Sequence, residues 1–377
     1  MQYPNSERRI KMPRFTRKTA AGLCFGAMVG LSLLLPTNYL TEDAGPALDV
    51  NGKINGVPVV SVKGVKTYPT STKLYMTTVS AWGSADGGVP GISALAALFS
   101  KDRQLIPVRA MYPKELSASQ VNTQNLELMR YSQDAAAVVA AETAGLPVSM
   151  DVTVAGTSAR FPSGKYLRKG DIIRAVGTDA KNMRQVRSHY ALTAFLRTVA
   201  PRTEIFLRVR RGKDTVTFSF PTLPYSAGGL DPHPGSLLGV EVRMENVKLP
   251  VRVKYAVEGI GGPSAGNMFT LGIYDRLTAG SLGGNRRIAG TGTVSWNGDI
   301  GPIGGIEHKM RGAARAGARH FLAPAENCPE TIGYEPEGMS VWAVRSVDES
   351  IAAVKAIAAG DTSGLRTCRQ IVRGGHG

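Results

Sequence analysis

A serine lies between a predicted strand and a predicted helix, inside a run of glycines. The strand covers residues 252–258, and Ser264 follows in the sequence Gly-Gly-Pro-Ser-Ala-Gly. Backbone N–H groups at the start of a helix attract negative charge, and flanking glycines let a substrate backbone approach closely. The N–H groups of Ser264 and Ala265 would form an oxyanion hole, so the pattern predicts that Ser264 is a nucleophile for acyl transfer.

A lysine that would serve as the base lies in the first turn of a later predicted helix, at about 306–316. Two glycines precede this helix, in the sequence Gly-Gly-Ile-Glu-His-Lys that ends at Lys309. The positive helix end and burial would both disfavour the ammonium form and lower the pKa of Lys309. A lysine with an ordinary pKa of about 10 is protonated and accepts no proton at neutral pH. The prediction is that Lys309 is neutral and deprotonates Ser264.

The serine loop has two other possible interpretations. A phosphate-binding loop of the Walker type needs Gly-Lys followed by Ser or Thr, and this sequence does not occur in the chain. The run 262–266 also satisfies the Gly-x-Ser-x-Gly elbow of α/β-hydrolases, and Asp299 and either His308 or His320 follow in the hydrolase order. A hydrolase-type esterase with a histidine base is therefore the alternative, although the upstream region lacks the pattern of one large parallel sheet.

The elements around these residues alternate between strand and helix, which predicts an α/β (α+β) domain at 240–360. The expected strands are 251–257, 290–295, 320–323 and 340–344, and the expected helices are 264–277, 306–316 and 348–358. A Gly- and Pro-containing linker is predicted at 223–239, and a polar tail at 361–377.

Residues 146–222 are predicted to form a β-rich unit of their own, with a helix near 182–199 and a hairpin at 204–220. The pattern Leu-x-x-Gly-Asp-x-Ile, which ends at Ile173, resembles the central strand of PDZ domains. That resemblance implies that an extended peptide adds as a strand beside the helix. The carboxylate-binding loop would lie near 146–148, where the usual Gly-Leu-Gly-Phe pattern is missing, so groove residues are not assigned.

The first residues predict a membrane anchor. A basic tail at 1–19 precedes an apolar segment at 20–40. About 20 apolar residues cross a bilayer and positive flanks stay in the cytoplasm, so the rest of the chain would lie outside the cytoplasm. A cleaved signal peptide is the alternative, but residues 42–44 make a poor cleavage site and a retained single-pass anchor is preferred. A β region and a helix at 117–144 are expected within 41–145.

Composition and cysteine content limit the remaining function classes. Hydrophobic residues make up 43% of the chain and charged residues 20%, which is ordinary for globular protein. The net charge of +16 is spread out, without zinc-finger spacing or an aromatic RNA-binding signature, so nucleic acid is not an expected partner. No metal or cofactor is needed. Cys24 lies in the apolar segment, and the sequence leaves open whether Cys328 and Cys368 form a disulfide.

Taken together, the motifs resemble the proteolytic domain of the Lon family. The run 263–266 looks like its nucleophile motif, 304–309 like its lysine motif, and 290–305 like the hairpin between them. The run 316–327 resembles the family's next strand and loop. The resemblance implies a catalytic dyad of Ser264 and Lys309, and it implies that the hydroxyl of Thr291 holds the lysine amine.

The order of anchor, strand region, PDZ-like unit and Lon-like domain resembles the bacterial PDZ-containing Lon-like proteases. This implies an endopeptidase that cleaves flexible or unfolded polypeptides without ATP, because the ATPase module of full Lon is absent, and it suggests assembly into a hexamer. The run 259–262 lacks the acidic residue that precedes Gly-Pro-Ser in many Lon enzymes. The non-enzyme alternative is a membrane-tethered PDZ adaptor with an inactive Lon-like domain.

Overall fold

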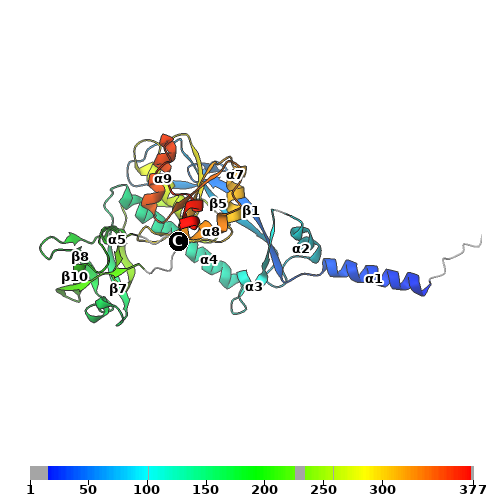
Figure 1. The fold of residues 1–377 in the computed structure, drawn as a ribbon, viewed down its shortest axis with the longest axis horizontal. Helices are drawn as coiled ribbons and strands as arrows, with labels where there is room; N and C mark the ends of the chain where they lie inside the picture. The colour runs from blue at the N-terminus through cyan, green and yellow to red at the C-terminus, as the bar shows by residue number, and fades with distance from the viewer. Residues whose placement is uncertain (1–15, 101, 226–233, 258, 375–377) are drawn as a thin grey trace, which may run out of the picture. The chain divides into compact units, whose positions relative to one another are not determined.

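The computed structural model describes residues 16–100, 102–225, 234–257 and 259–374 (Figure 1). Most of the predicted basic tail, including Arg8, Arg9, Lys11 and Arg14, lies outside the described residues. The chain divides into two compact units. Unit 1 comprises 1–43 and 81–118, and unit 2 comprises 44–80 and 119–377.

Unit 1 begins with α1 (Arg17–Leu34), in which no residue is buried. The helix ends before the residue preceding Pro36, as expected because a proline disfavours helical backbone in the residue before it. Short elements follow: α2 (Gly91–Leu98), α3 (Val108–Met111) and β6 (Gln104–Pro107), which pairs antiparallel with the start of β1 (Tyr39–Asp49). Among the residues that the structure describes, no helix is long and apolar enough to cross a membrane.

Unit 2 contains a mostly parallel sheet in the order β20–β19–β16–β5–β1. Its strands are β5 (Lys73–Trp82), β16 (Arg287–Gly290), β19 (His320–Pro324) and β20 (Ser340–Val344), together with β1. The parallel pairs are β5 with β16, β16 with β19, and β19 with β20. The longest strands of the predicted β region, β1 and β5, therefore belong to the sheet of the α/β domain.

Helices in this unit contribute buried side chains to the core. These are α4 (Ala118–Thr143), α6 (Gly266–Leu277), α7 (Ile306–Arg315) and α9 (Val347–Ala359). Smaller pairs complete the unit: β4 (Val60–Lys63) with β15 (Arg252–Tyr255), β2 (Lys53–Ile54) with β3 (Val57–Pro58), and β17 (Thr293–Val294) with β18 (Ile300–Gly301). Two short helices complete the described elements: α8 (Cys328–Thr331) lies between β19 and β20, and α10 (Cys368–Gly374) follows α9.

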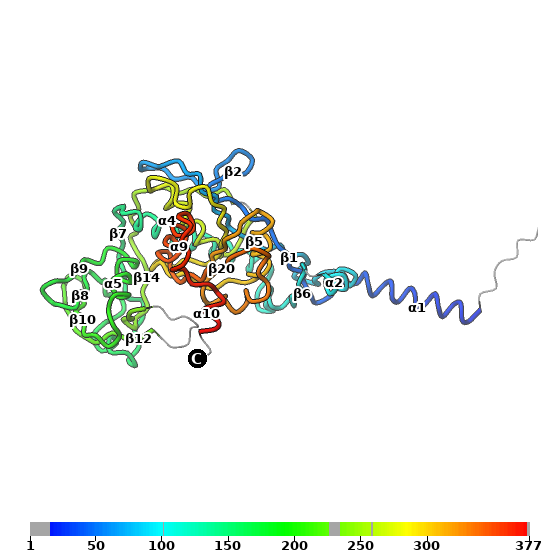
Figure 2. Tube along the Cα trace, turned by 45° about the horizontal axis from the view of Figure 1, so that its top comes forward, coloured from blue at the N-terminus to red at the C-terminus, as the bar shows by residue number. Residues whose placement is uncertain are grey.

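A second sheet in unit 2 has the order β11–β10–β8–β7–β14. It contains β7 (Ser149–Thr157), β8 (Ile172–Gly177), β10 (Glu204–Arg211), β11 (Asp214–Pro221) and β14 (Val240–Lys248), and α5 (His189–Leu196) lies in the same part of the chain (Figure 2). The predicted hairpin is present, with Arg211 opposite Asp214. We refer to residues 149–248 as the PDZ-like unit.

The end of the PDZ-like unit differs from the predicted boundary. The predicted linker at 223–239 contains β12 (Leu223–Pro224) and β13 (Ser236–Leu237), which pair with each other. The next residues form β14, which pairs antiparallel with β7 and so joins the PDZ-like sheet. Apolar residues alternate with charged ones at the start of β14, the pattern of a half-buried strand, but the pattern does not show which sheet the strand joins.

Candidate active site

Ser264 lies in the turn that leads into α6. A hydrogen bond from the Gly266 N–H to the Pro263 carbonyl oxygen (3.2 Å) closes the turn, and the Ser132 hydroxyl on α4 donates to the same oxygen (2.8 Å). A Cβ at position 266 would lie 2.4 Å from Ser132 Oγ and 2.9 Å from the Val294 nitrogen. The glycine is therefore required because the turn lies tightly against α4 and the hairpin.

The backbone of Ser264 is held by the chain that follows β16. The Gly292 N–H donates to the Ser264 carbonyl oxygen at 2.8 Å, and the Thr291 hydroxyl donates to the same oxygen at 3.0 Å. Ala265 is the N-cap of α6, where N–H groups have no acceptor within the helix. The predicted oxyanion donors thus lie at the start of a buried helix.

Lys309 is buried because it lies on the apolar face of α7. Ile306, Met310 and Ala313 form this face at the three- and four-residue spacing of a helix, and Lys309 falls within it. The residue is only 3% exposed. Its amine Nζ donates to the Thr291 hydroxyl oxygen at 3.3 Å, and Thr291 is fully buried. The structure therefore brings the predicted base and the predicted orienting hydroxyl together.

Ser264 and Lys309 line the same cavity, which has a volume of about 300 Å³. The cavity is also lined by Pro46, Met129 of α4, Ala265, residues 76–80 of β5 and the run Gly-Ile-Gly-Gly at 259–262. The sequence did not predict the β5 residues as part of the site. Ligand sites in open sheets occur beyond the carboxyl ends of parallel strands. Met76 of β5 lies opposite Gly290, the carboxyl end of β16, so the following residues of β5 extend beyond that end, but this can be recognised only once the strand order is known.

The residues of the hydrolase alternative are held elsewhere. Asp299 pairs with Arg197 at 2.6 Å, and His320 Nδ1 accepts a hydrogen bond from Trp342 Nε1 at 3.2 Å. His308 is buried on α7 next to Lys309, with its Nε2 3.8 Å from a Glu307 carboxylate oxygen. Within the described residues, no histidine lines the cavity at Ser264. The geometry thus favours Lys309 over a histidine as the base.

The helix that carries Lys309 packs unusually closely on β1. A Cβ at Gly312 would lie 2.7 Å from the Gly45 carbonyl oxygen, a backbone atom that cannot rotate away. We expect Gly312→Ala to displace α7 and lower the rate of peptide cleavage about 10- to 100-fold, because small misplacements of a catalytic group have effects of this size. The control is Gly364→Ala, since a Cβ there meets nothing within 4 Å and the residue lies outside the lysine motif. Equal steady-state rates for the two variants would contradict this account of helix placement.

Comparison with protein families matches residues 243–355 to the Lon protease (S16) C-terminal proteolytic domain. The predicted resemblance of this part of the chain to the Lon proteolytic domain is confirmed. Lon protease 2 of Bacillus subtilis (strain 168) is 33% identical over 90 residues, which are 24% of this chain and 16% of that protein. The Lon protease of Chloroflexus aggregans (strain MD-66 / DSM 9485) is 37% identical over 93 residues, 23% of this chain and 11% of that protein. The matched region is thus a small part of these relatives.

Comparison with solved structures finds PDZ domains of SdrC-like proteins. The domain from Listeria monocytogenes is 13% identical with a TM-score of 0.20, and the match covers 24% of this chain and 86% of that one. The domain from Listeria innocua is 14% identical with a TM-score of 0.20, and the match covers 25% of this chain and 93% of that one. Each of these matches is thus confined to a quarter of the chain at most.

Proposed function

We propose that the protein is an endopeptidase that cleaves flexible or unfolded polypeptides without ATP, with Ser264 as the nucleophile and Lys309 as the general base. One observation carries the proposal. Lys309 and Ser264 line one cavity, the buried amine of Lys309 contacts Thr291, and the Thr291 hydroxyl in turn donates to the carbonyl oxygen of Ser264. Burial disfavours the ammonium form of Lys309, as a proton acceptor requires.

The reaction would proceed in two halves. Neutral Lys309 takes the proton of the Ser264 hydroxyl, and Oγ attacks the scissile carbonyl carbon. The N–H groups of Ser264 and Ala265 stabilise the oxyanion, and its collapse expels the amine product, which takes the proton from Lys309. Water then attacks the ester carbon and gives a proton to Lys309, which returns it to Ser264. Thr291 holds the amine in line throughout.

The test is cleavage of casein, an unstructured protein, by the full-length chain in detergent without nucleotide. We expect new peptide N-termini to accumulate, to be unaffected by added ATP or EDTA, and to be absent with Lys309→Met. Hydrolysis of a small acyl ester without cleavage of casein would instead support the hydrolase alternative. A folded protein that cleaves neither substrate would support the inactive adaptor.

The PDZ-like unit is proposed to present polypeptide ends to this site. The strand β14 pairs with β7 on one side, and it is the last strand of the PDZ-like sheet in the part of the chain that is described. The segment before it contacts the end of α5, because the Ser236 hydroxyl donates to the Leu196 carbonyl oxygen at 3.5 Å. A peptide would add to the open edge of β14 by backbone pairing.

A cluster of charges joins the PDZ-like unit to the loop between β17 and β18. Arg197, at the end of α5, donates to Asp299 (2.6 Å), to the Asn297 carbonyl oxygen (3.3 Å) and to Asp348 (3.3 Å). Burial lowers the pKa of His189, at the start of α5, to about 4. His189 is therefore neutral near pH 7, and Arg197 supplies a positive charge that faces the two aspartates. The contacted loop lies between Thr291 and Lys309 in the chain, so we propose that this contact couples the two parts.

Replacing Arg197 by methionine is expected to lower kcat/KM for protein substrates about three- to tenfold, since coupling between sites is commonly worth such a factor. The change keeps the aliphatic stem but removes every hydrogen bond to the loop. Casein and a short fluorogenic peptide should be compared, with Arg202→Met, which replaces an exposed arginine in the turn after α5, as the control. Unchanged kinetics for both substrates in the Arg197 variant would show that the contact has no role in catalysis.

The location outside the cytoplasm, with α1 at the membrane, also remains a proposal. Large apolar side chains of α1 are exposed, among them Leu23 at 57%, Phe25 at 66% and Leu31 at 59%. A disulfide joins Cys328 to Cys368, which suits an oxidising compartment. Fractionation of cells that express the full chain should place it in the membrane pellet and leave the peptidase domain open to external protease. Recovery in the soluble cytoplasmic fraction would refute both parts.

A further inference from the structure

The segment before α7 lacks regular secondary structure, yet it must set the position of Lys309. Ile303 and the two glycines that follow lie between β18 and α7, and Gly305, the N-cap of α7, has a positive φ of 66°. A helix N-terminus entered through two flexible glycines needs an external contact to fix its position, because glycine restricts the backbone least.

Asn327 provides such a contact. Its side-chain oxygen accepts a hydrogen bond from the Ile303 N–H at 2.9 Å, and its amide nitrogen donates to the Ile303 carbonyl oxygen at 2.8 Å. One side chain therefore satisfies both main-chain polar groups of Ile303, as a neighbouring strand would. Asn327 is 1% exposed, and an unpaired polar group at such a buried position would be costly. The cost of breaking either bond therefore keeps Asn327 and Ile303 in this arrangement.

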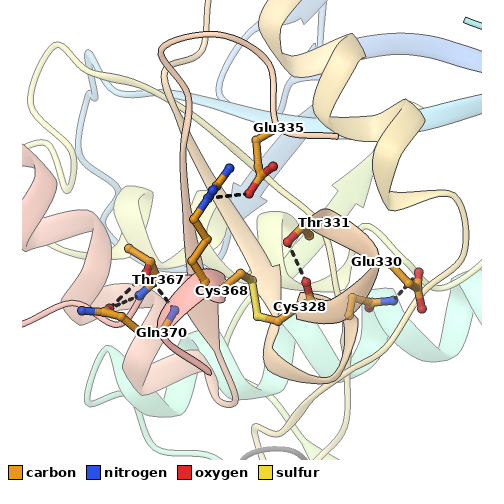
Figure 3. The surroundings of a disulfide bond; sticks show 9 residues. Cys328, Glu330, Thr331, Glu335, Thr367, Cys368 and Gln370 are labelled. Atoms are coloured by element: carbon orange, nitrogen blue, oxygen red, sulfur yellow. Dashed lines mark hydrogen bonds and ion pairs between the residues drawn. A yellow bond between two sulfur atoms is a disulfide. The ribbon is translucent and has the colours of Figure 1, made fainter. Parts of the chain in front are cut away.

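A disulfide fixes the chain next to Asn327. Cys328 follows directly and is bonded to Cys368, which joins the start of α8 to α10 (Figure 3). Both cysteines are buried in one apolar cluster that also contains Ile306, Met310 and Ala313, the buried face of α7. The disulfide, the segment with Asn327 and the lysine helix are therefore packed together as one body.

We propose that Asn327 is a positioning residue of the Ser264–Lys309 site, that it fixes the start of α7 through Ile303, and that the Cys328–Cys368 disulfide fixes Asn327. The inference rests on the proposed function. It predicts that loss of the bidentate contact lowers kcat without changing KM, because the residues of β5 that line the substrate cavity are untouched.

The first test compares the full-length chain with Asn327→Asp and Asn327→Ala. Aspartate has nearly the same shape and keeps an acceptor for the Ile303 N–H, but it places an oxygen against the Ile303 carbonyl. We expect kcat to fall about 10- to 100-fold in both variants with KM within twofold. The rise of the pH–rate profile should also move to higher pH, because a displaced and more solvated lysine is deprotonated less readily.

The control is Glu330→Gln. Glu330 also accepts a hydrogen bond from the Asn327 amide (3.1 Å), but it is exposed and does not contact Ile303. We expect this variant to keep wild-type kcat and pH profile. All rates are to be normalised to the fraction of active sites titrated by a fluorophosphonate.

A purely structural role would lower the thermal midpoint and the titrated fraction while leaving kcat per titrated site and the pH profile unchanged, and that result would overturn the proposal. Failure of the proposed function would look different, since wild type would then cleave nothing or Lys309→Met would remain active.

A second test addresses the disulfide. A dithiol such as dithiothreitol supplies two electrons and two protons, so Cys328 and Cys368 become thiols and the reductant becomes a cyclic disulfide. We expect reduced wild type to lose three- to tenfold in kcat, and the double variant Cys328→Ala, Cys368→Ala to show the lower kcat with or without reductant. Full activity of the reduced protein, with both thiols verified by alkylation, would overturn the part of the proposal that concerns the disulfide.

Discussion

Replacing Lys309 by methionine is expected to lower kcat for peptide cleavage by about 10³-fold or more while leaving the protein folded. Methionine fits the apolar face of α7 beside Ile306 and Met310 but accepts no proton. Replacing a buried neutral lysine by an apolar side chain of similar size removes a buried polar group without leaving a cavity, so the thermal midpoint should not fall.

The matched control is Lys355→Met, because Lys355 is also a helical lysine but is exposed on α9. Its kcat on a fluorogenic peptide should equal that of wild type. If Lys309→Met retained more than a tenth of wild-type activity, another group would have to be the base and the dyad would be wrong.

Replacing Ser264 by alanine is expected to have the largest effect, a loss of about 10⁴-fold or more, because no acyl-enzyme can form. The N–H groups at the start of α6 and the strand residues of the cavity remain, so substrate binding should persist. The variant should therefore bind fluorescently labelled casein with wild-type affinity while releasing no peptides. Ser363→Ala is the control, since that serine lies in an exposed turn far along the chain from the site.

Continued cleavage by Ser264→Ala, after removal of any contaminating protease by a second purification on another matrix, would contradict the nucleophile assignment. If Ser264→Ala lost both casein binding and casein cleavage, the substitution would have changed the cavity. In that case Ser264→Cys, which keeps a nucleophile of similar size, should restore measurable turnover if the assignment is right.

The site could be predicted largely from local sequence. Gly-Gly-Pro-Ser-Ala-Gly before a helix fixes the environment of Ser264 within a few residues, and the three- and four-residue spacing on α7 places Lys309 among buried apolar side chains. Thr291 was assigned by resemblance, and the structure places its hydroxyl between the other two residues. The role of each residue in catalysis stays a prediction until the variants are measured.

The features of the fold and site that could not be predicted depend on contacts between distant parts of the chain. The strands β1 and β5 have ordinary strand patterns, and nothing local indicates that they pair beside β16 and line the site. Ser132 contacts the turn that carries Ser264, and Asn327 contacts the segment before α7. Each does so with one side chain from a distant element, so neither belongs to a recognisable sequence motif. Residues 240–248 were predicted to begin the α/β domain, whereas they form β14 of the PDZ-like sheet, and only the register of β14 with β7 shows this.

The central claim is that Lys309, and not a histidine, activates Ser264. It is tested most directly by the rate at which a fluorophosphonate modifies the protein, followed by intact mass and peptide mapping in wild type, Ser264→Ala, Lys309→Met and His308→Gln. The account predicts one adduct on Ser264 in wild type and in His308→Gln at similar rates, none in Ser264→Ala, and a rate at least 100-fold slower in Lys309→Met. Rapid labelling of Lys309→Met together with loss of labelling in His308→Gln would contradict the account and establish the histidine-dependent hydrolase instead.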